Sequence, residues 1–254
     1  MPKPGVYHAG VPCWVVLTTP DTARAQAFYG ALFDWEFVPT GPAEAVATRY
    51  GAQVAGVVRA RPTDPPAAWT TFLACPDPAR TLTAVRAAGG RLAREPYEVP
   101  EQGRAALAVD PLGARFGLWQ AGTIDGAGLV DEPGVLAWNE HLSPDPDAAR
   151  AFYHRVFGYG YDRPRAGHAL ARVAGLPACS IGPADPATGT GARWLVHFAT
   201  EDTDRTADRL RALGGTVVTG PAPAPFGRTA LVRDDAGAEF VLVAVPARDA
   251  AAAA

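Results

Sequence analysis

The stretch WNEHLSPDPDAARAFYHRVF, residues 138–157, has the pattern of a strand, a turn rich in Pro and Asp, and an amphipathic helix with a Phe-Tyr pair. The same pattern occurs earlier in the chain as WVVLTTPDTARAQAFYGALF, residues 14–33. Three aromatic pairs keep one spacing, because 138 − 14, 152 − 28 and 157 − 33 all equal 124. A repeat of this length predicts two copies of one architecture.

Each copy contains a second strand–helix unit. In the first copy, residues 69–75 form a strand pattern, Asp77-Pro78 opens a helix, and Gly89-Gly90 ends it before three more strands. The second copy repeats this order over residues 194–245, with a helix expected at 203–213. The chain is therefore predicted to be α+β, with two strand-helix-strand-strand-strand modules in each copy.

The segment between the copies is rich in Gly and has few large apolar side chains, which is typical of a linker. The sequence predicts an N-terminal arm at 1–11, a first domain at 12–120, a linker at 121–134, a second domain at 135–245 and a flexible tail at 246–254.

Composition narrows the class of protein. A hydrophobic content of 48% with 19% charged residues is typical of a soluble folded chain, and a net charge of −3 gives no reason to expect nucleic acid or an anionic membrane as partner. The cysteines, Cys13, Cys75 and Cys179, form no CxxC pair, which favours a reducing compartment. Because no apolar run resembles a signal peptide or a membrane span, we expect a cytoplasmic protein.

Two motifs resemble the vicinal oxygen chelate superfamily, which includes glyoxalase I, bleomycin-resistance and fosfomycin-resistance proteins and extradiol dioxygenases. They are Asp, six residues and Phe-Tyr on the first helix, and Asp-Pro-x-Gly before the last strand. The likeness extends from Pro12 to Val245. With W-N-E in the second half, it is similar to tandem glyoxalase-like proteins of actinobacteria, often described as hydroxylases. The resemblance implies that two modules form one cupped mixed sheet with the helices outside.

The resemblance also implies where a metal would be held, on the first and last strands of the modules. The corresponding positions are Trp14, Thr70 and Gly117 in the first domain and Trp138, Leu195 and Val241 in the second. A divalent cation requires several oxygen, nitrogen or sulfur donors in defined geometry, and these residues do not provide that set. We therefore predict that the usual metal site is absent from both domains and that no cofactor is bound.

Strand alternation places residues two apart on one face. If Trp138 faces the cup, so do Glu140 and Leu142, and the same rule turns His197 inward. The first domain has Val16 and Phe72 at the positions of Glu140 and His197. We predict that Glu140 and His197 are a catalytic acid–base pair. The predicted ligand contacts are Trp138, Leu142, Leu195, Val241, Trp14 and Phe72.

Three functions remain open at this stage. The first is a metal-independent enzyme that acts on an aromatic or polycyclic metabolite, in secondary metabolism. The second is a protein that sequesters an antibiotic or metabolite without chemistry, as the resemblance to bleomycin-resistance proteins implies. The third is a metal-dependent lyase or dioxygenase that uses Glu140, His197 and Glu239. All three predict a small-molecule ligand, and a monomer or homodimer. Alternatively, Glu140 could pair with an arginine such as Arg172 or Arg228.

Overall fold

The computed structural model describes residues 7–62, 64–65, 67–165, 167–188, 191–224 and 226–245. The tail expected at 246–254 and the first six residues of the expected arm lie outside the described residues. The strands and helices of the first repeat are β1 (Pro12–Thr19), α1 (Thr22–Phe33), β2 (Glu36–Gly41), β3 (Glu44–Arg49), β4 (Ala52–Arg59), β5 (Ala68–Ala74), α2 (Pro78–Ala87), β6 (Arg91–Val99), β7 (Gly103–Val109) and β8 (Arg115–Ala121). Those of the second repeat are β9 (Leu136–Ser143), α3 (Pro146–Phe157), β10 (Gly160–Tyr161), β11 (Ala169–Val173), β12 (Leu176–Pro183), the short 3₁₀ helix η1 (Pro186–Thr188), β13 (Arg193–Thr200), α4 (Thr203–Ala212), β14 (Thr216–Ala224), β15 (Gly227–Arg233) and β16 (Glu239–Ala244).

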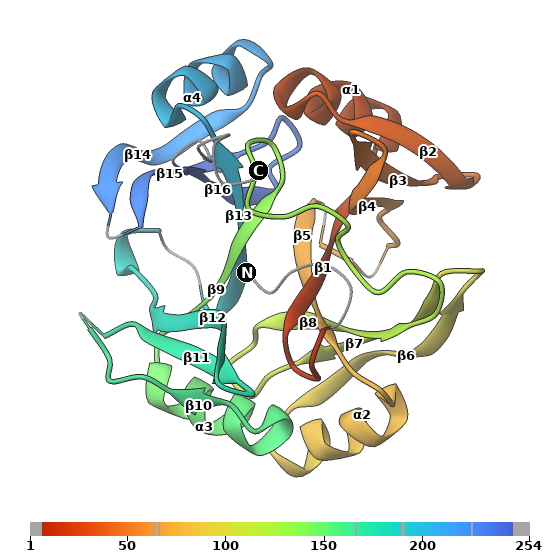
Figure 1. Cartoon of the computed structure of the whole chain (residues 1–254), viewed down its shortest axis with the longest axis vertical. Coiled ribbons are helices and arrows are strands. Elements are labelled where there is room, and N and C mark those ends of the chain that lie inside the picture. The colour runs from red at the N-terminus through yellow and green to blue at the C-terminus, as the bar shows by residue number, and fades with distance from the viewer. Residues whose placement is uncertain are drawn as a thin grey trace, which may run out of the picture. The chain divides into compact units, whose positions relative to one another are not determined.

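The strands form two eight-stranded sheets over the part of the chain that is described (Figure 1). The first has the order β2-β3-β4-β1-β5-β8-β7-β6, and the second has the equivalent order β10-β11-β12-β9-β13-β16-β15-β14. Parallel pairs such as β5 with β8 and β9 with β12 join antiparallel hairpins, so each sheet is mixed. The predicted α+β class with two strand-helix-strand-strand-strand modules per repeat is confirmed.

Each of the four α-helices in the described part of the chain begins after an aspartate. Asp21, Asp77, Asp145 and Asp202 each accept a hydrogen bond from the backbone N–H three residues later. This contact satisfies one of the N–H groups that a helix start leaves without an intrahelical partner. The Pro/Asp turns thus fix where each helix leaves its strand.

Contacts between residues divide the chain into two compact units. Unit 1 comprises residues 1–16, 69–128 and 139–196, and unit 2 comprises 17–68, 129–138 and 197–254. Each unit therefore combines one module from each repeat. In unit 1, α2 packs beside α3, and in unit 2, α1 packs beside α4 (Figure 1). The predicted division into domains at 12–120 and 135–245 stays a prediction.

Each unit has its own apolar core. In unit 1, Phe116, Phe152 and Trp194 are among the buried members. In unit 2, rings of Tyr29 and Trp35 stack with centroids 5.5 Å apart. The three cysteines are buried and form no disulfide.

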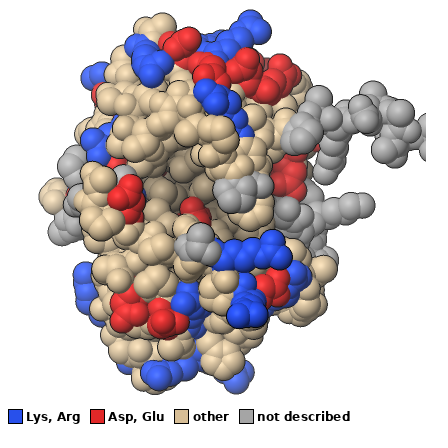
Figure 2. Space-filling model, turned by 90° about the vertical axis from the view of Figure 1, so that its left-hand side faces the viewer, with Lys and Arg blue, Asp and Glu red and all other residues tan. Residues whose placement is uncertain are grey.

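Charged side chains of both signs are intermixed on the face that Figure 2 shows. Among the described residues, no helix is long and apolar enough to cross a bilayer.

Candidate functional site

Strand β9 has two different faces. On the back face, Asn139, His141 and Ser143 are fully buried. Helix α3 covers this face, since the ring of His141 lies 5.2 Å from that of Tyr153. The front face carries the half-buried Trp138, Glu140 and Leu142. This alternation agrees with the sequence prediction and leaves the carboxylate of Glu140 on the side of the strand that solvent reaches.

The carboxylate of Glu140 belongs to a polar cluster on the front face. Its Oε1 accepts a hydrogen bond of 3.1 Å from the Ser180 hydroxyl and lies 2.9 Å from Nδ1 of His168. Ser180 is directly opposite Glu140 in the parallel pair of β9 and β12. Since a carboxylate can only accept, Nδ1 of His168 carries the donated proton. The side chains of Glu140 and His168 are 17% and 41% exposed, so a ligand in solvent can reach the pair.

The hydrogen bond that His168 donates to Glu140 raises the pKa of His168 above its ordinary value, while partial burial of the ring opposes this change. The imidazolium form therefore persists to higher pH than in an isolated histidine. A protonated imidazole beside an ionised carboxylate can donate a proton to a ligand oxygen.

A tight turn delivers His168 to Glu140. Arg165 and His168 exchange backbone hydrogen bonds of 2.8 and 2.9 Å across this turn, and Gly167 has a φ of +81°. The imidazole then lies against the backbone of Gly182 on β12, where a Cβ atom would overlap the ring. Only glycine leaves enough space for His168 at this position.

Replacing Gly182 with Ala is expected to move His168 away from Glu140, because the added methyl group needs the space of the ring. The pKa of His168 should then fall towards its reference value of about 6.5. Gly160→Ala is the matched control, since Gly160 lies in the same sheet and a Cβ there meets only a carbonyl oxygen at 4.0 Å. Neither glycine has a positive φ. Proton NMR of the histidine rings against pH measures the effect, and an unchanged His168 titration in Gly182→Ala would contradict the packing.

The sequence pattern predicts His197, and not His168, as the partner of Glu140. His197 is half-buried on β13 and lies opposite Val241 of β16. The catalytic pair of Glu140 and His197 stays a prediction, whereas the carboxylate of Glu140 contacts the imidazole of His168. The sequence does indicate that some group packs closely against β12. Gly182 interrupts an apolar strand where the first repeat has Val58, and such a glycine is typical of a close approach.

The remaining predicted ligand contacts are buried against the chain itself. Trp14, Phe72, Leu195 and Val241 are each less than one-tenth exposed. The ring of Phe72 lies over Gly117, its partner in the parallel pair of β5 and β8. Ligand contact by these four residues stays a prediction, and so does contact by the half-buried Trp138 and Leu142.

The residues at the superfamily's ligand positions do not fit a metal. In the first sheet, the ring of Phe72 fills the space beside Gly117. In the second, Val241 lies next to His197 and offers no donor. Glu239, the alternative ligand, accepts two hydrogen bonds from Arg233 at 2.6 and 3.0 Å. No group of three or more His, Cys, Asp or Glu side chains among the described residues is arranged to hold an ion.

A buried polar network lies behind β9, in unit 1. Asp110 Oδ2 accepts from Nε2 of His141 at 2.8 Å and from the Tyr153 hydroxyl at 3.2 Å, while its Oδ1 accepts from the N–H groups of Leu112 and Ala114. The indole of Trp194 donates to the Tyr153 oxygen at 2.8 Å. Burial, with a further contribution from Asp110, raises the pKa of Tyr153.

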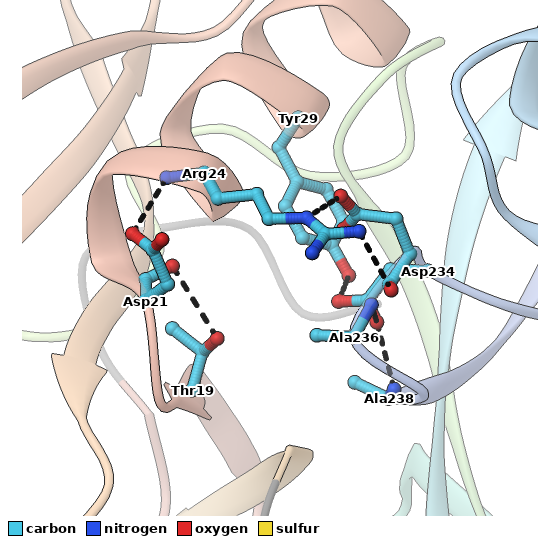
Figure 3. Close-up of polar contacts among 8 residues, drawn as sticks. Thr19, Asp21, Arg24, Tyr29, Asp234, Ala236 and Ala238 are labelled. Carbon is cyan, nitrogen blue, oxygen red and sulfur yellow. Dashed lines mark hydrogen bonds and ion pairs between the residues drawn. The ribbon is translucent and has the colours of Figure 1, made fainter.

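Unit 2 contains a simpler form of this network (Figure 3). Asp234 accepts a hydrogen bond of 2.9 Å from the Tyr29 hydroxyl, and its other oxygen accepts from the N–H groups of Ala236 and Ala238. Burial raises the pKa of Asp234. The position equivalent to His141 is Leu17, so the second aspartate has no imidazole partner.

A surface depression of about 410 Å³ lies beside α3, and neither Glu140 nor His168 is among its lining residues. Its lining residues are Asp147, Arg150, Ala151, His154, Tyr161, Asp162, Arg163 and Pro164.

The repeated modules and paired mixed sheets define a protein with the vicinal oxygen chelate fold. The chain belongs to the family described as "Glyoxalase-like domain", which matches residues 14–119 and 140–243. It is 37% identical to "Putative glyoxylase CFP32" of Mycobacterium tuberculosis, over 94% of this chain and 97% of that protein. It is 35% identical to "Anthracycline biosynthesis protein DnrV" of Streptomyces peucetius, over 93% and 94% of the two chains.

Solved structures share the fold at lower identity. The Mn(II)-bound glyoxalase from Novosphingobium aromaticivorans is 20% identical with a TM-score of 0.65, over 93% of this chain and 83% of that one. The 2,3-dioxygenase LapB from Pseudomonas sp. KL28 is 15% identical with a TM-score of 0.64, over 95% and 96% of the two chains. At these identities the likeness shows the fold alone.

Proposed function

We propose that the front face of β9 binds a hydroxylated polycyclic aromatic molecule and that the pair of Glu140 and His168 transfers a proton to it. The observation that carries this proposal is the solvent-accessible hydrogen bond of 2.9 Å between the carboxylate and the imidazole. A ligand cannot reach a fully buried ion pair, whereas the pair of Glu140 and His168 is partly exposed to solvent.

The geometry suggests a role for each group. Glu140 holds Nδ1 of His168, so Nε2 is the nitrogen left to donate to a ligand. Transfer of the Nε2 proton to a ligand carbonyl or phenolate oxygen leaves a neutral imidazole that keeps its proton on Nδ1. The Ser180 hydroxyl holds the carboxylate in place.

The ligand class is supported by the relatives. The chain is similar along nearly its whole length to DnrV and to DauV of Streptomyces sp. strain C5, both described as anthracycline biosynthesis proteins. Anthracyclines are polycyclic, hydroxylated and aromatic, and their carbonyl and phenolate oxygens are groups to which the imidazolium of His168 can donate a proton.

Fluorescence titration with a hydroxyanthraquinone tests the site. We expect Glu140→Gln and His168→Gln to weaken binding by about 10- to 150-fold, the effect of losing a hydrogen bond of about 1.5–3 kcal/mol to a charged group. The control is Glu98→Gln, because Glu98 is 75% exposed and pairs only across the surface with Arg104. Wild-type affinity in both site variants would refute the proposal.

An incubation with the same ligand distinguishes catalysis from sequestration. The protein is incubated with the hydroxyanthraquinone, and the ligand is then recovered and measured by mass spectrometry and absorbance. A product that forms with the wild type and not with His168→Gln supports proton transfer. Stoichiometric recovery of unchanged ligand would overturn the catalytic part and leave a sequestering protein.

A further inference from the structure

We propose that His141 is a positioning residue for Glu140. In this inference, which rests on the proposed function, polar contacts on the back face of β9 hold the strand so that the carboxylate on the front face meets His168. His141 and Glu140 are consecutive residues, so a bond that fixes one limits the movement of the other.

Each of the three polar side chains on the back face of β9 makes a hydrogen bond. Asn139 Oδ1 accepts from the Thr71 hydroxyl at 2.7 Å, and Nε2 of His141 donates to Asp110 at 2.8 Å. The Ser143 hydroxyl accepts from a backbone N–H at the start of the following turn at 3.0 Å. Two of these side chains, Asn139 and His141, are thus tied to segments from the other repeat, while Ser143 binds within its own turn.

The fold itself does not require these polar residues. The equivalent strand of the first repeat, β1, has Val15 and Leu17 in place of Asn139 and His141, and it occupies the same place in its sheet. Burying an amide and an imidazole is costly unless both are hydrogen-bonded, and apolar residues at such positions give equal or greater stability. The polar back face occurs in the repeat that has Glu140, where the first repeat has Val16.

Hydrogen bonds can fix the position of a strand more closely than apolar packing does. Apolar side chains tolerate small shifts of a strand, whereas a hydrogen bond is lost when its length or angle changes modestly. The acceptor for His141 is itself held, because Asp110 also binds two backbone N–H groups and the Tyr153 hydroxyl. A rigid acceptor on one side of β9 therefore sets the position of the carboxylate on the other, as an accurate site requires.

The substitution His141→Leu tests this role, because leucine is the residue of the first repeat. Without His141, Asp110 would still accept from the Tyr153 hydroxyl and from two backbone N–H groups. Asp234 in unit 2 has the same three kinds of donor, with Leu17 at the position of His141, so the fold should be retained. We expect the pKa of His168 to fall and the affinity for hydroxyanthraquinone to drop about tenfold, or about 1.4 kcal/mol. The NMR resonance of His168 is assigned by its absence from the spectrum of the His168→Gln variant.

Two further variants separate positioning from general loss of stability. Asn139→Val introduces the residue of the first repeat and removes the contact with Thr71. It should lower the pKa of His168, as His141→Leu does. Tyr29→Phe removes the hydroxyl contact with Asp234 in unit 2 and should leave the pKa of His168 unchanged. Folded His141→Leu and Asn139→Val proteins with wild-type His168 pKa and affinity would overturn the inference.

The experiment also distinguishes this inference from the proposed function. Glu140→Gln should lower the pKa of His168 because the charged acceptor is lost. If Glu140→Gln has no effect on that pKa, the pair of Glu140 and His168 is itself refuted. If Glu140→Gln lowers it and His141→Leu does not, only the positioning role fails.

Discussion

Replacing Asp110 with Ala is expected to lower the free energy of unfolding by about 3–5 kcal/mol, because several buried hydrogen-bond donors lose their common acceptor. The carboxylate and His141 are both fully buried. Its removal leaves the imidazole, the Tyr153 hydroxyl and two backbone N–H groups without their acceptor, in a place that water does not reach. Each such buried group costs about 1–3 kcal/mol, partly offset as the site relaxes.

Urea titration with a constant m-value measures this loss. Asp208→Ala is the control, because Asp208 is 75% exposed and pairs with Arg211 on the helix surface, so its removal should change stability by less than about 0.5 kcal/mol. Asp234→Ala should cost less than Asp110→Ala, since Asp234 has no imidazole partner. Equal losses at the two aspartates would show that His141 adds nothing to the network.

The repeat and its alternation predict the fold because they are local signals. Regular spacing of apolar residues decides which face of a strand or helix is buried, and the Asp at each turn decides where a helix starts. The same signals do not show which residues meet across repeats. Alternation places His141 on the back face of β9, yet its partner Asp110 belongs to the other repeat and lies in a turn.

The division of the chain shows the same limit. The repeat does not show how its modules group in space, and the contacts join each module with one from the other repeat. The Phe-Tyr and Asp-Pro-x-Gly motifs explain part of this grouping. Tyr153 of the second repeat binds Asp110 of the first, and Tyr29 of the first binds Asp234 of the second. Each motif is one half of a contact that the other repeat completes.

Of the two residues in the contact between Glu140 and His168, the sequence pattern indicated only Glu140. Glu140 was found because it is an acidic residue at a strand position where the first repeat has Val16. His168 lies in a turn, where periodicity carries no information about direction. Its place becomes clear only when the turn is folded onto Gly182.

Replacing Phe72 with Ala should lower the free energy of unfolding by about 3–5 kcal/mol, because it empties the space of a buried ring over Gly117. Gly117→Val alone should also destabilise, by about 1–3 kcal/mol or more, since its Cβ would overlap that ring. Both losses are measured by urea titration, with Phe226→Ala as a control on an 80% exposed ring.

The double variant, Phe72→Ala with Gly117→Val, decides whether the two positions form one packed pair. The second sheet has His197 opposite Val241 at the equivalent positions, which shows that this strand pair accepts valine when its partner is not Phe. Valine should therefore fill part of the space that the ring leaves, and the double variant should be more stable than the sum of the single losses by at least about 1 kcal/mol. Strict additivity would mean that Phe72 does not exclude a side chain at position 117. The glycine at a superfamily ligand position would then need a different explanation from packing.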